Sequence, residues 1–267
     1  MKLSVARKHQ KQLEPEDNYL ASVSDLMSAL LFVFILALIV ACININNATE
    51  GLKKSQASID EILNIYHGNN VARAHLLERI RDKVLQKSEG KLHLQVDESR
   101  GVLRIPESAV TFKIGKSSLD EHNINNLNLI GSILAEELIC YQQEHFDSAY
   151  CLKTNKEHRT IDAIFIEGHT DNQRYAYDVS DQKNRELSTQ RSNAAYYWMI
   201  YRNKTLKSLT NPKDEHLFSL SGYGSERPLN KYDKPRADPA NRRIELRVLF
   251  TPPTQEDIDK IVLRKEN

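Results

Sequence analysis

One carboxylate stands alone in the longest apolar stretch of the sequence. From Tyr19 to Ile45 the chain carries a single charged residue, Asp25. About 20 apolar residues in a helix cross the hydrocarbon core of a bilayer, so the stretch predicts a transmembrane helix over residues 19–45. A buried carboxyl group favours its neutral form, and an ionisable side chain inside a membrane is a candidate for ion transfer. We therefore expect Asp25 to carry an ion by alternating between neutral and charged forms.

The same stretch has two other interpretations. Asp25 could mark the edge of the span and reach water with its side chain, which would make it functionally inert. Alternatively, Ile39-Val40-Ala41-Cys42 resembles a lipobox, so that the chain would be cut before Cys42 and anchored by lipid on that thiol. Against the lipobox, the segment before the span holds three acids, which signal peptides usually lack; they are Glu14, Glu16 and Asp17.

The charges around the span predict its orientation. Four basic residues precede it, Lys2, Arg7, Lys8 and Lys11, whereas no Lys or Arg follows it before Lys53. The positive-inside rule then places residues 1–18 in the cytoplasm and the rest of the chain outside it, in a bacterial cell in the periplasm. Ser22, Asp25 and Ser28 recur at helical spacing and form a small polar stripe suited to packing against another helix.

Two further residues, Asp171 and Arg191, could together bind a zwitterion. Asp171 follows the short apolar strand expected over residues 161–167 and can receive an ammonium group. Arg191 lies in the helix expected over residues 185–201 and offers a guanidinium fork to a carboxylate. Together they would bind a free amino-carboxylate group, unless they only pair with each other.

The elements that must position these residues follow from hydrophobic periodicity. Residues 46–90 predict a helical linker of two amphipathic helices, interrupted at His67-Gly68-Asn69-Asn70. Residues 91–252 predict a domain with a hairpin that turns at Ser99-Arg100-Gly101 and an amphipathic helix over 118–141. The strands expected over 161–167, 217–221 and 243–250 alternate with helices, which indicates an α/β fold, in the form of an α+β sandwich with a mixed sheet. A tail, residues 253–267, contains a short helix over 255–264.

Composition narrows the classes of function. The 267 residues have a net charge of +1, which disfavours a nucleic-acid-binding protein. Three cysteines cannot build a four-cysteine zinc site, but Cys140 and Cys151 can pair in an oxidising compartment. His169 and Asp171, or His145 and His158, are too few donors to predict a metal site. The sequence lacks a nucleophile elbow and a phosphate loop, so we expect no enzyme and no cofactor.

Four motifs in fixed order resemble the OmpA-like peptidoglycan-binding domain over residues 95–250. They are GHTD at 168–171, NRELSTQR at 184–191, GYG at 222–224 and DPANRRIE at 238–245. The resemblance implies a mixed sheet with helices on one face and a pocket for the peptidoglycan stem peptide. By the same resemblance, that pocket uses Thr170, Asp171, Asn184, Arg191, Asn241 and Arg242. The segment between Asp171 and Asn184 is longer than in typical members and holds Tyr175 and Tyr177.

The segment Ser24-Asp25-Leu26-Met27-Ser28-Ala29-Leu30 is similar to the aspartate segment of MotB-type stator B-subunits, including those of flagellar motors and of the Zorya anti-phage system. The resemblance implies a homodimer in the bacterial inner membrane, surrounded by an A-subunit oligomer of the MotA or ZorA type and driven by H⁺ or Na⁺. The insertions and the lack of a basic, glycine-rich leader favour the Zorya type over a flagellar stator. The lipobox interpretation instead implies a Pal-like lipoprotein that tethers the membrane to the wall.

Overall fold

The computed structural model describes residues 15–173 and 181–266, which form two compact units. The first unit consists of residues up to Glu61 together with those from Asp259 onward, and the second spans Ile62–Ile258. The predicted insertion residues Tyr175 and Tyr177 lie outside the described residues, as do the N-terminal acid Glu14 and the four basic residues before the span.

Helix α1, Pro15–Lys87, contains the predicted membrane span. Its apolar part is long enough to cross a membrane, with a mean hydropathy of 3.1 over its most apolar window and none of that window buried. Apolar side chains from Leu20 to Ile45 are exposed. A helix that is apolar all round and uncovered by protein is suited to a lipid environment.

The expected break at residues 67–70 is wrong, because α1 continues through them to Lys87. A glycine inside a helix costs only about 1 kcal/mol relative to alanine. The residues that follow bury one face of the helix, and this burial outweighs that cost. Those core residues of α1 are Leu76, Leu77, Ile80 and Val84, so the compact unit starts inside the segment expected to be a linker.

Helix α6 spans Gln255–Glu266, and its residues from Asp259 onward belong to the first unit, where they contact α1. Ser58 of α1 and Ile261 of α6 are both buried. Arg264 pairs with Glu61 at 3.8 Å between Nη1 and Oε1.

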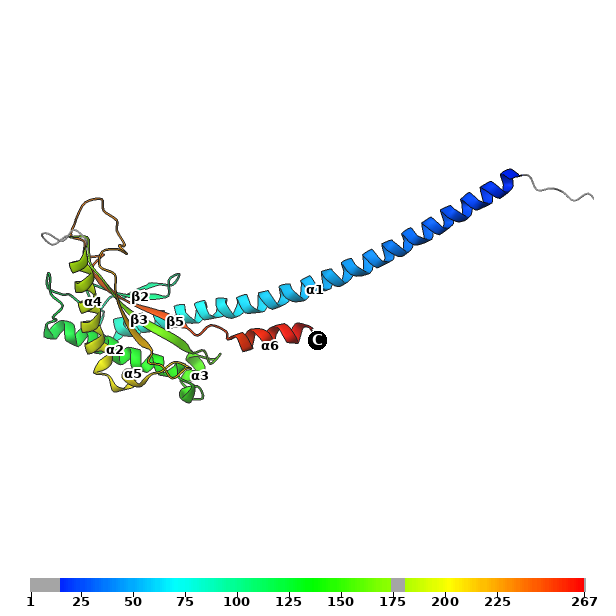
Figure 1. Ribbon diagram of the computed structural model, residues 1–267. Helices are drawn as coiled ribbons and strands as arrows, with labels where there is room; N and C mark the ends of the chain where they lie inside the picture. The colour runs from blue at the N-terminus through cyan, green and yellow to red at the C-terminus, as the bar shows by residue number, and fades with distance from the viewer. Residues whose placement is uncertain (1–14, 174–180, 267) are drawn as a thin grey trace, which may run out of the picture. The chain divides into compact units, whose positions relative to one another are not determined.

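The second unit is a mixed α/β domain built on one five-stranded sheet. The strands are β1 (Gln95–Asp97), β2 (Val102–Pro106), β3 (Ile161–His169), β4 (Phe218–Gly222) and β5 (Arg243–Phe250). Their order in the sheet is β1-β2-β5-β3-β4, in which only β3 and β4 are parallel. Figure 1 shows β5 between β2 and β3, although it is the last strand in the sequence. The predicted mixed sheet is confirmed.

Every second residue of the strands contributes to a single core. Ile164 and Ile166 of β3 and Ile244 and Leu246 of β5 point to this side of the sheet. The helices that cover it are α2 (Glu121–Leu138) and α4 (Gln182–Tyr196), which continues as a π turn over Tyr197–Tyr201. The N-terminus of α2 is capped by Asp120, whose carboxylate accepts a hydrogen bond from the Asn123 amide at 2.9 Å.

Two glycines set how closely α4 approaches the sheet. A Cβ atom on Gly168 would lie 2.0 Å from the Ser188 carbonyl oxygen, and one on Gly222 would lie 2.1 Å from Thr189 Oγ1. Larger residues would therefore push α4 away from β3 and β4. This close packing brings the side chains of α4 beside the residues that follow β3.

Candidate functional site

A cavity of about 380 Å³ lies at the end of β3, between the loop after β2 and helix α4. Its walls contain five of the six predicted pocket residues, Thr170, Asp171, Asn184, Arg191 and Arg242. The first two follow β3, the next two lie on α4, and Arg242 directly precedes β5. Four sequence segments thus converge on one pocket.

The acid of the pocket is held by several donors. Asp171 Oδ2 accepts a hydrogen bond from Arg242 Nη1 at 2.5 Å and one from the Asp238 amide at 3.3 Å. Its other oxygen accepts the amide of Gln173 at 3.3 Å. Asp171 is buried, but it faces the cavity and is fixed there by these contacts.

Arg242 also binds a second carboxylate. Its Nε and Nη2 atoms donate to the two oxygens of Glu107 at 2.7 and 2.6 Å. The hydrogen bonds that Arg242 donates to Glu107 and Asp171 raise the pKa of its guanidinium above the ordinary value, against the opposing effect of burial. Asp171, Arg242 and Glu107 therefore form a continuous chain of charges along one wall.

Arg191 shapes the opposite wall. Its Nε and Nη2 atoms donate to the backbone carbonyls of Lys116 and Lys113 at 3.1 and 3.2 Å. The guanidinium carbon lies 5.1 Å from the centre of the Phe112 ring, a cation–π contact. Arg191 thus both lines the pocket and holds the loop that forms its rim.

Thr170 lines the cavity and has an unsatisfied, buried hydroxyl. The residue is 3% exposed, and its Oγ1 atom has no hydrogen-bond partner among the described residues. Buried polar atoms nearly always have a partner in protein or water. The Thr170 hydroxyl is therefore a buried polar group beside the cavity whose hydrogen bond is not made within the described residues.

The remaining two predicted residues differ in place. Asn184 lines the cavity and donates from Nδ2 to the Gln173 carbonyl at 2.8 Å and to Asp181 at 2.7 Å. Asn241 does not line it: its Oδ1 accepts the amides of Leu229 and Asn230 at 2.7 and 3.0 Å. The structure thus gives Asn241 the role of holding the loop before β5, because its side chain points to that loop.

Seven further wall residues had not been predicted, Glu107, Phe112, Ile114, Gly115, Gln173, Leu187 and Ala237. Glu107 follows β2 and is far from the sequence motifs, so only the sheet pairing of β2 with β5 brings it to Arg242. Ile114 is 92% exposed on the rim loop. This exposure of an apolar side chain beside a polar cavity is visible only in the structure. The sequence of the loop therefore gave no indication that Ile114 lines the pocket.

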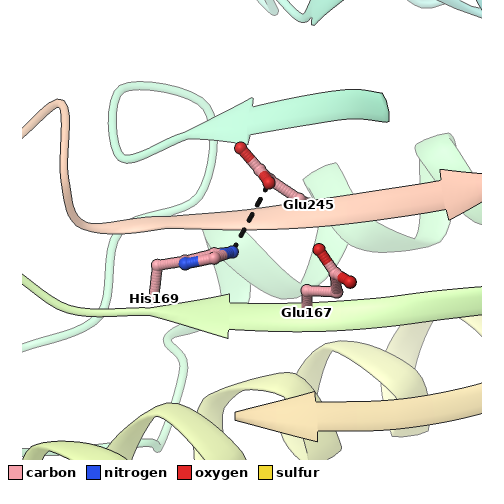
Figure 2. A group of neighbouring side chains, drawn as sticks. All are labelled: Glu167, His169 and Glu245. Carbon is pink, nitrogen blue, oxygen red and sulfur yellow. Dashed lines mark ion pairs between the residues drawn. The ribbon is translucent and has the colours of Figure 1, made fainter. Parts of the chain in front are cut away.

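The opposite face of the sheet carries a buried charged cluster of Glu167, His169 and Glu245 (Figure 2). His169 Nε2 lies 3.5 Å from Glu245 Oε2. The His169 ring stacks on Tyr223 with centroids 5.4 Å apart. Burial lowers the pKa of His169, which keeps the imidazole neutral.

Three arginines already balance the carboxylates of this cluster. Arg247 binds both oxygens of Glu167 at 2.9 and 2.7 Å, and Arg104 and Arg243 donate to Glu245 Oε1 at 2.9 and 2.8 Å. Although burial opposes its charge, contacts from His169 and Arg243 hold the pKa of Glu245 far below the usual value. A divalent cation would add charge to groups that are already neutralised, so this donor set suits a structural role better than metal binding.

The remaining predicted residues lie outside the pocket. Asp25 is on the exposed surface of α1, as is the free thiol of Cys42. Cys140 and Cys151 form a disulfide, with their Cα atoms 4.9 Å apart. It joins the turn after α2 to the short helix α3, Cys151–Thr154.

The domain that holds the pocket matches a known protein family. The family model described as the OmpA family matches residues 111–242. This part of the chain is an OmpA-family domain. The match covers every pocket residue except Glu107, which lies four positions before its start. A search of curated proteins gave no significant match.

Several solved structures resemble the OmpA-family domain. A putative MotB-like protein from Desulfovibrio vulgaris has 19% identity and a TM-score of 0.40, over 71% of this chain and 99% of that one. The periplasmic domain of Helicobacter pylori MotB has 18% identity and a TM-score of 0.38, over 62% and 85%. The cell wall anchor of the T6SS from Pseudomonas aeruginosa has 15% identity and a TM-score of 0.39, over 64% and 96%. None of these likenesses bears on function at such identities and TM-scores.

Proposed function

We propose that the OmpA-family domain binds the peptidoglycan stem peptide and that the chain is the wall-anchored B-subunit of an ion-driven stator. The observation that carries the binding proposal is the pocket itself, where two carboxylates and two guanidiniums line one cavity. Balanced charge of this kind suits a ligand that carries both an ammonium and a carboxylate. The free end of diaminopimelate in a stem peptide is such a ligand.

Each end of the ligand has a receptor. Asp171 and Glu107 would receive the ammonium group. Arg191 and Arg242 would attract the carboxylate by their charge, which their contacts within the domain hold at the wall of the cavity. The chain would thus bind and hold the wall, and not catalyse a reaction on it.

The membrane half of the proposal rests on Asp25. It is the one charged residue between Tyr19 and Ile45, in a helix long and apolar enough to cross a membrane. Passage of one charge down the membrane potential yields about 2.3 kcal/mol per 100 mV. Asp25 would couple this free energy to motion by binding and releasing H⁺ or Na⁺ between the B-subunit dimer and an A-subunit oligomer. The wall-bound domain would resist the resulting torque.

Within this class we favour a Zorya-type defence motor over a flagellar stator. The support is the long segment between Asp171 and Asn184. The genes beside this one discriminate the two: flagellar neighbours would indicate motility, and an A-subunit gene beside helicase or nuclease genes would indicate defence. A mature protein whose N-terminus precedes Cys42, found by mass spectrometry, would exclude the lipoprotein alternative.

Wall binding is tested by co-sedimentation of the full chain, in detergent, with purified peptidoglycan. We expect Asp171→Ala to abolish binding because it removes the ammonium receptor. Arg191→Ala should also abolish binding. Arg191→Lys keeps the positive charge but lacks the planar guanidinium, so it tests whether ligand recognition needs that group or only its charge. Arg185→Ala on the exposed side of α4 is the matched control and should bind normally. Undiminished binding by both Asp171→Ala and Arg191→Lys would reject the pocket.

A further inference from the structure

A second cavity, of about 370 Å³, lies between the C-terminal part of α1 and the chain that joins α3 to β3. It shares no wall residue with the OmpA-family pocket. We call it the cationic groove, after its ionisable wall residues His75, Arg79, Lys153, Lys156, Glu157 and Arg159. All of them belong to the compact unit Ile62–Ile258.

The positive charge of the groove is only partly balanced. Its walls hold four permanent cations and one carboxylate, Glu157, which pairs with Arg159. Arg79 is neutralised from behind by the buried Glu137, at 3.0 Å. Within the described residues, Lys153 and Lys156 have no carboxylate partner, although they face the same cavity. Like charges gathered in a concave surface repel one another and favour a bound anion.

The loop that presents these cations is firmly built. Asn155 is buried, donates to the carbonyls of Cys140 and Arg159 at 2.8 Å each, and accepts the Arg159 amide at 2.9 Å. The Cys140–Cys151 disulfide anchors the start of the loop. The backbone that carries Lys153, Lys156 and Arg159 is therefore held in place before any ligand arrives, which lowers the entropic cost of binding.

Helix α1 has a glycine where the Arg159 side chain contacts it. The side chain of Arg159 lies across Gly68 and donates to Asn69. A Cβ atom on Gly68 would lie 2.4 Å from Arg159 Nη2, so any other residue there would displace the guanidinium. This close approach explains why a glycine stands in the middle of α1.

We propose that the cationic groove binds a phosphate-bearing ligand. A phosphate carries up to two negative charges and three strong acceptor oxygens. It matches the two lysines as point charges, beside the Arg159 guanidinium that Glu157 already pairs with. The cavity is larger than a single phosphate group, so the rest of the ligand has room beside it. The phosphate belongs either to a soluble compound or to a lipid headgroup, which share this chemistry.

The test is calorimetric titration of the full chain, in a non-ionic detergent at constant ionic strength. The probes are inorganic pyrophosphate and the soluble lipid dihexanoyl phosphatidylglycerol. We expect Lys153→Gln with Lys156→Gln to weaken binding roughly tenfold or more, because two charge-assisted contacts are lost. Gly68→Ala should weaken it as well without changing the net charge. Lys213→Gln with Lys231→Gln removes the same charge from exposed positions outside the groove and should leave binding unchanged.

The outcomes separate the sources of the phosphate. Binding of pyrophosphate that depends on the groove indicates a soluble ligand, and binding of the lipid alone indicates a headgroup. Failure of both probes to bind would overturn the proposal. Equal losses in the Lys153/Lys156 and Lys213/Lys231 variants would also overturn it, because the effect would then reflect net charge alone.

Discussion

The guanidinium of Arg242 donates a hydrogen bond to the carboxylate of Asp171 inside the OmpA-family pocket. The same guanidinium binds Glu107 through two further nitrogen atoms. One cation thus binds two acids that come from different parts of the sequence. Together with Arg191 on the opposite wall, the charged groups of the pocket sum to zero before a ligand enters.

Arg242→Gln would leave Asp171 and Glu107 close together without a shared cation. We expect the free energy of unfolding to fall by about 1.5–3 kcal/mol, the range for hydrogen bonds to charged groups. The change is measured by denaturant unfolding, followed by the fluorescence of Trp198, the one tryptophan of the chain.

Adding Glu107→Gln to Arg242→Gln should recover part of this loss, because it removes one of the two repelling charges. Additive effects of the two substitutions would show that Glu107 and Arg242 do not interact in solution, contrary to their bidentate contact.

Asp25→Asn keeps the size of the side chain but cannot release a proton. If Asp25 carries the coupling ion, ion flux should be lost when the variant is co-expressed with its A-subunit, while Asp25→Glu should retain part of it. Flux is measured with a pH- or sodium-sensitive dye in reconstituted vesicles. Full flux in Asp25→Asn would show that the aspartate merely borders the membrane.

The buried imidazole of His169 should make domain stability depend on pH. Its folded pKa is lowered by burial, so near and below the unfolded value of about 6.5 the unfolded state binds more protons. Stability from this group is therefore present above pH 6.5 and is lost as the pH falls. Between pH 7.5 and 5.5 we expect a loss of up to about 1.4 kcal/mol.

Denaturant unfolding at several pH values measures this dependence. His169→Gln should flatten it over this window, whereas His93→Gln, at an exposed position, should not. The carboxylate of Glu245 acts at lower pH: its pKa is lowered on folding, so its contribution is complete above the unfolded value and declines only in stronger acid. An unchanged slope in His169→Gln would contradict the neutral state of the buried ring.

The Cys140–Cys151 disulfide closes a loop of sequence separation 11. Its loss, by Cys140→Ser with Cys151→Ser, should lower the free energy of unfolding by about 2–3 kcal/mol, mainly because the unfolded chain becomes less constrained. A reducing agent should shift the wild-type unfolding midpoint in the same direction and leave the double variant unaffected. A midpoint that is insensitive to reduction would mean that the thiols are not paired in solution.

Features set by local pattern were evident in the sequence. The hydropathy of residues 19–45 and the alternation in Arg243–Phe250 depend only on neighbouring residues, so the long apolar helix and strand β5 could be predicted. The short motifs around Asp171 and Arg191 likewise identified two pocket walls, because each motif lies directly after a strand or on the helix that packs against it.

Other features depend on contacts between distant residues and needed the tertiary structure. Glu107 reaches Arg242 only through the pairing of β2 with β5. Helix α1 passes through Gly68 because burial of its later turns against the core outweighs the cost of a glycine. Asn241 turns to the loop at Leu229 instead of the pocket, since its Oδ1 accepts two backbone amides there. Local spacing predicts which elements form, but the packing of one element on another decides which side chains share a cavity.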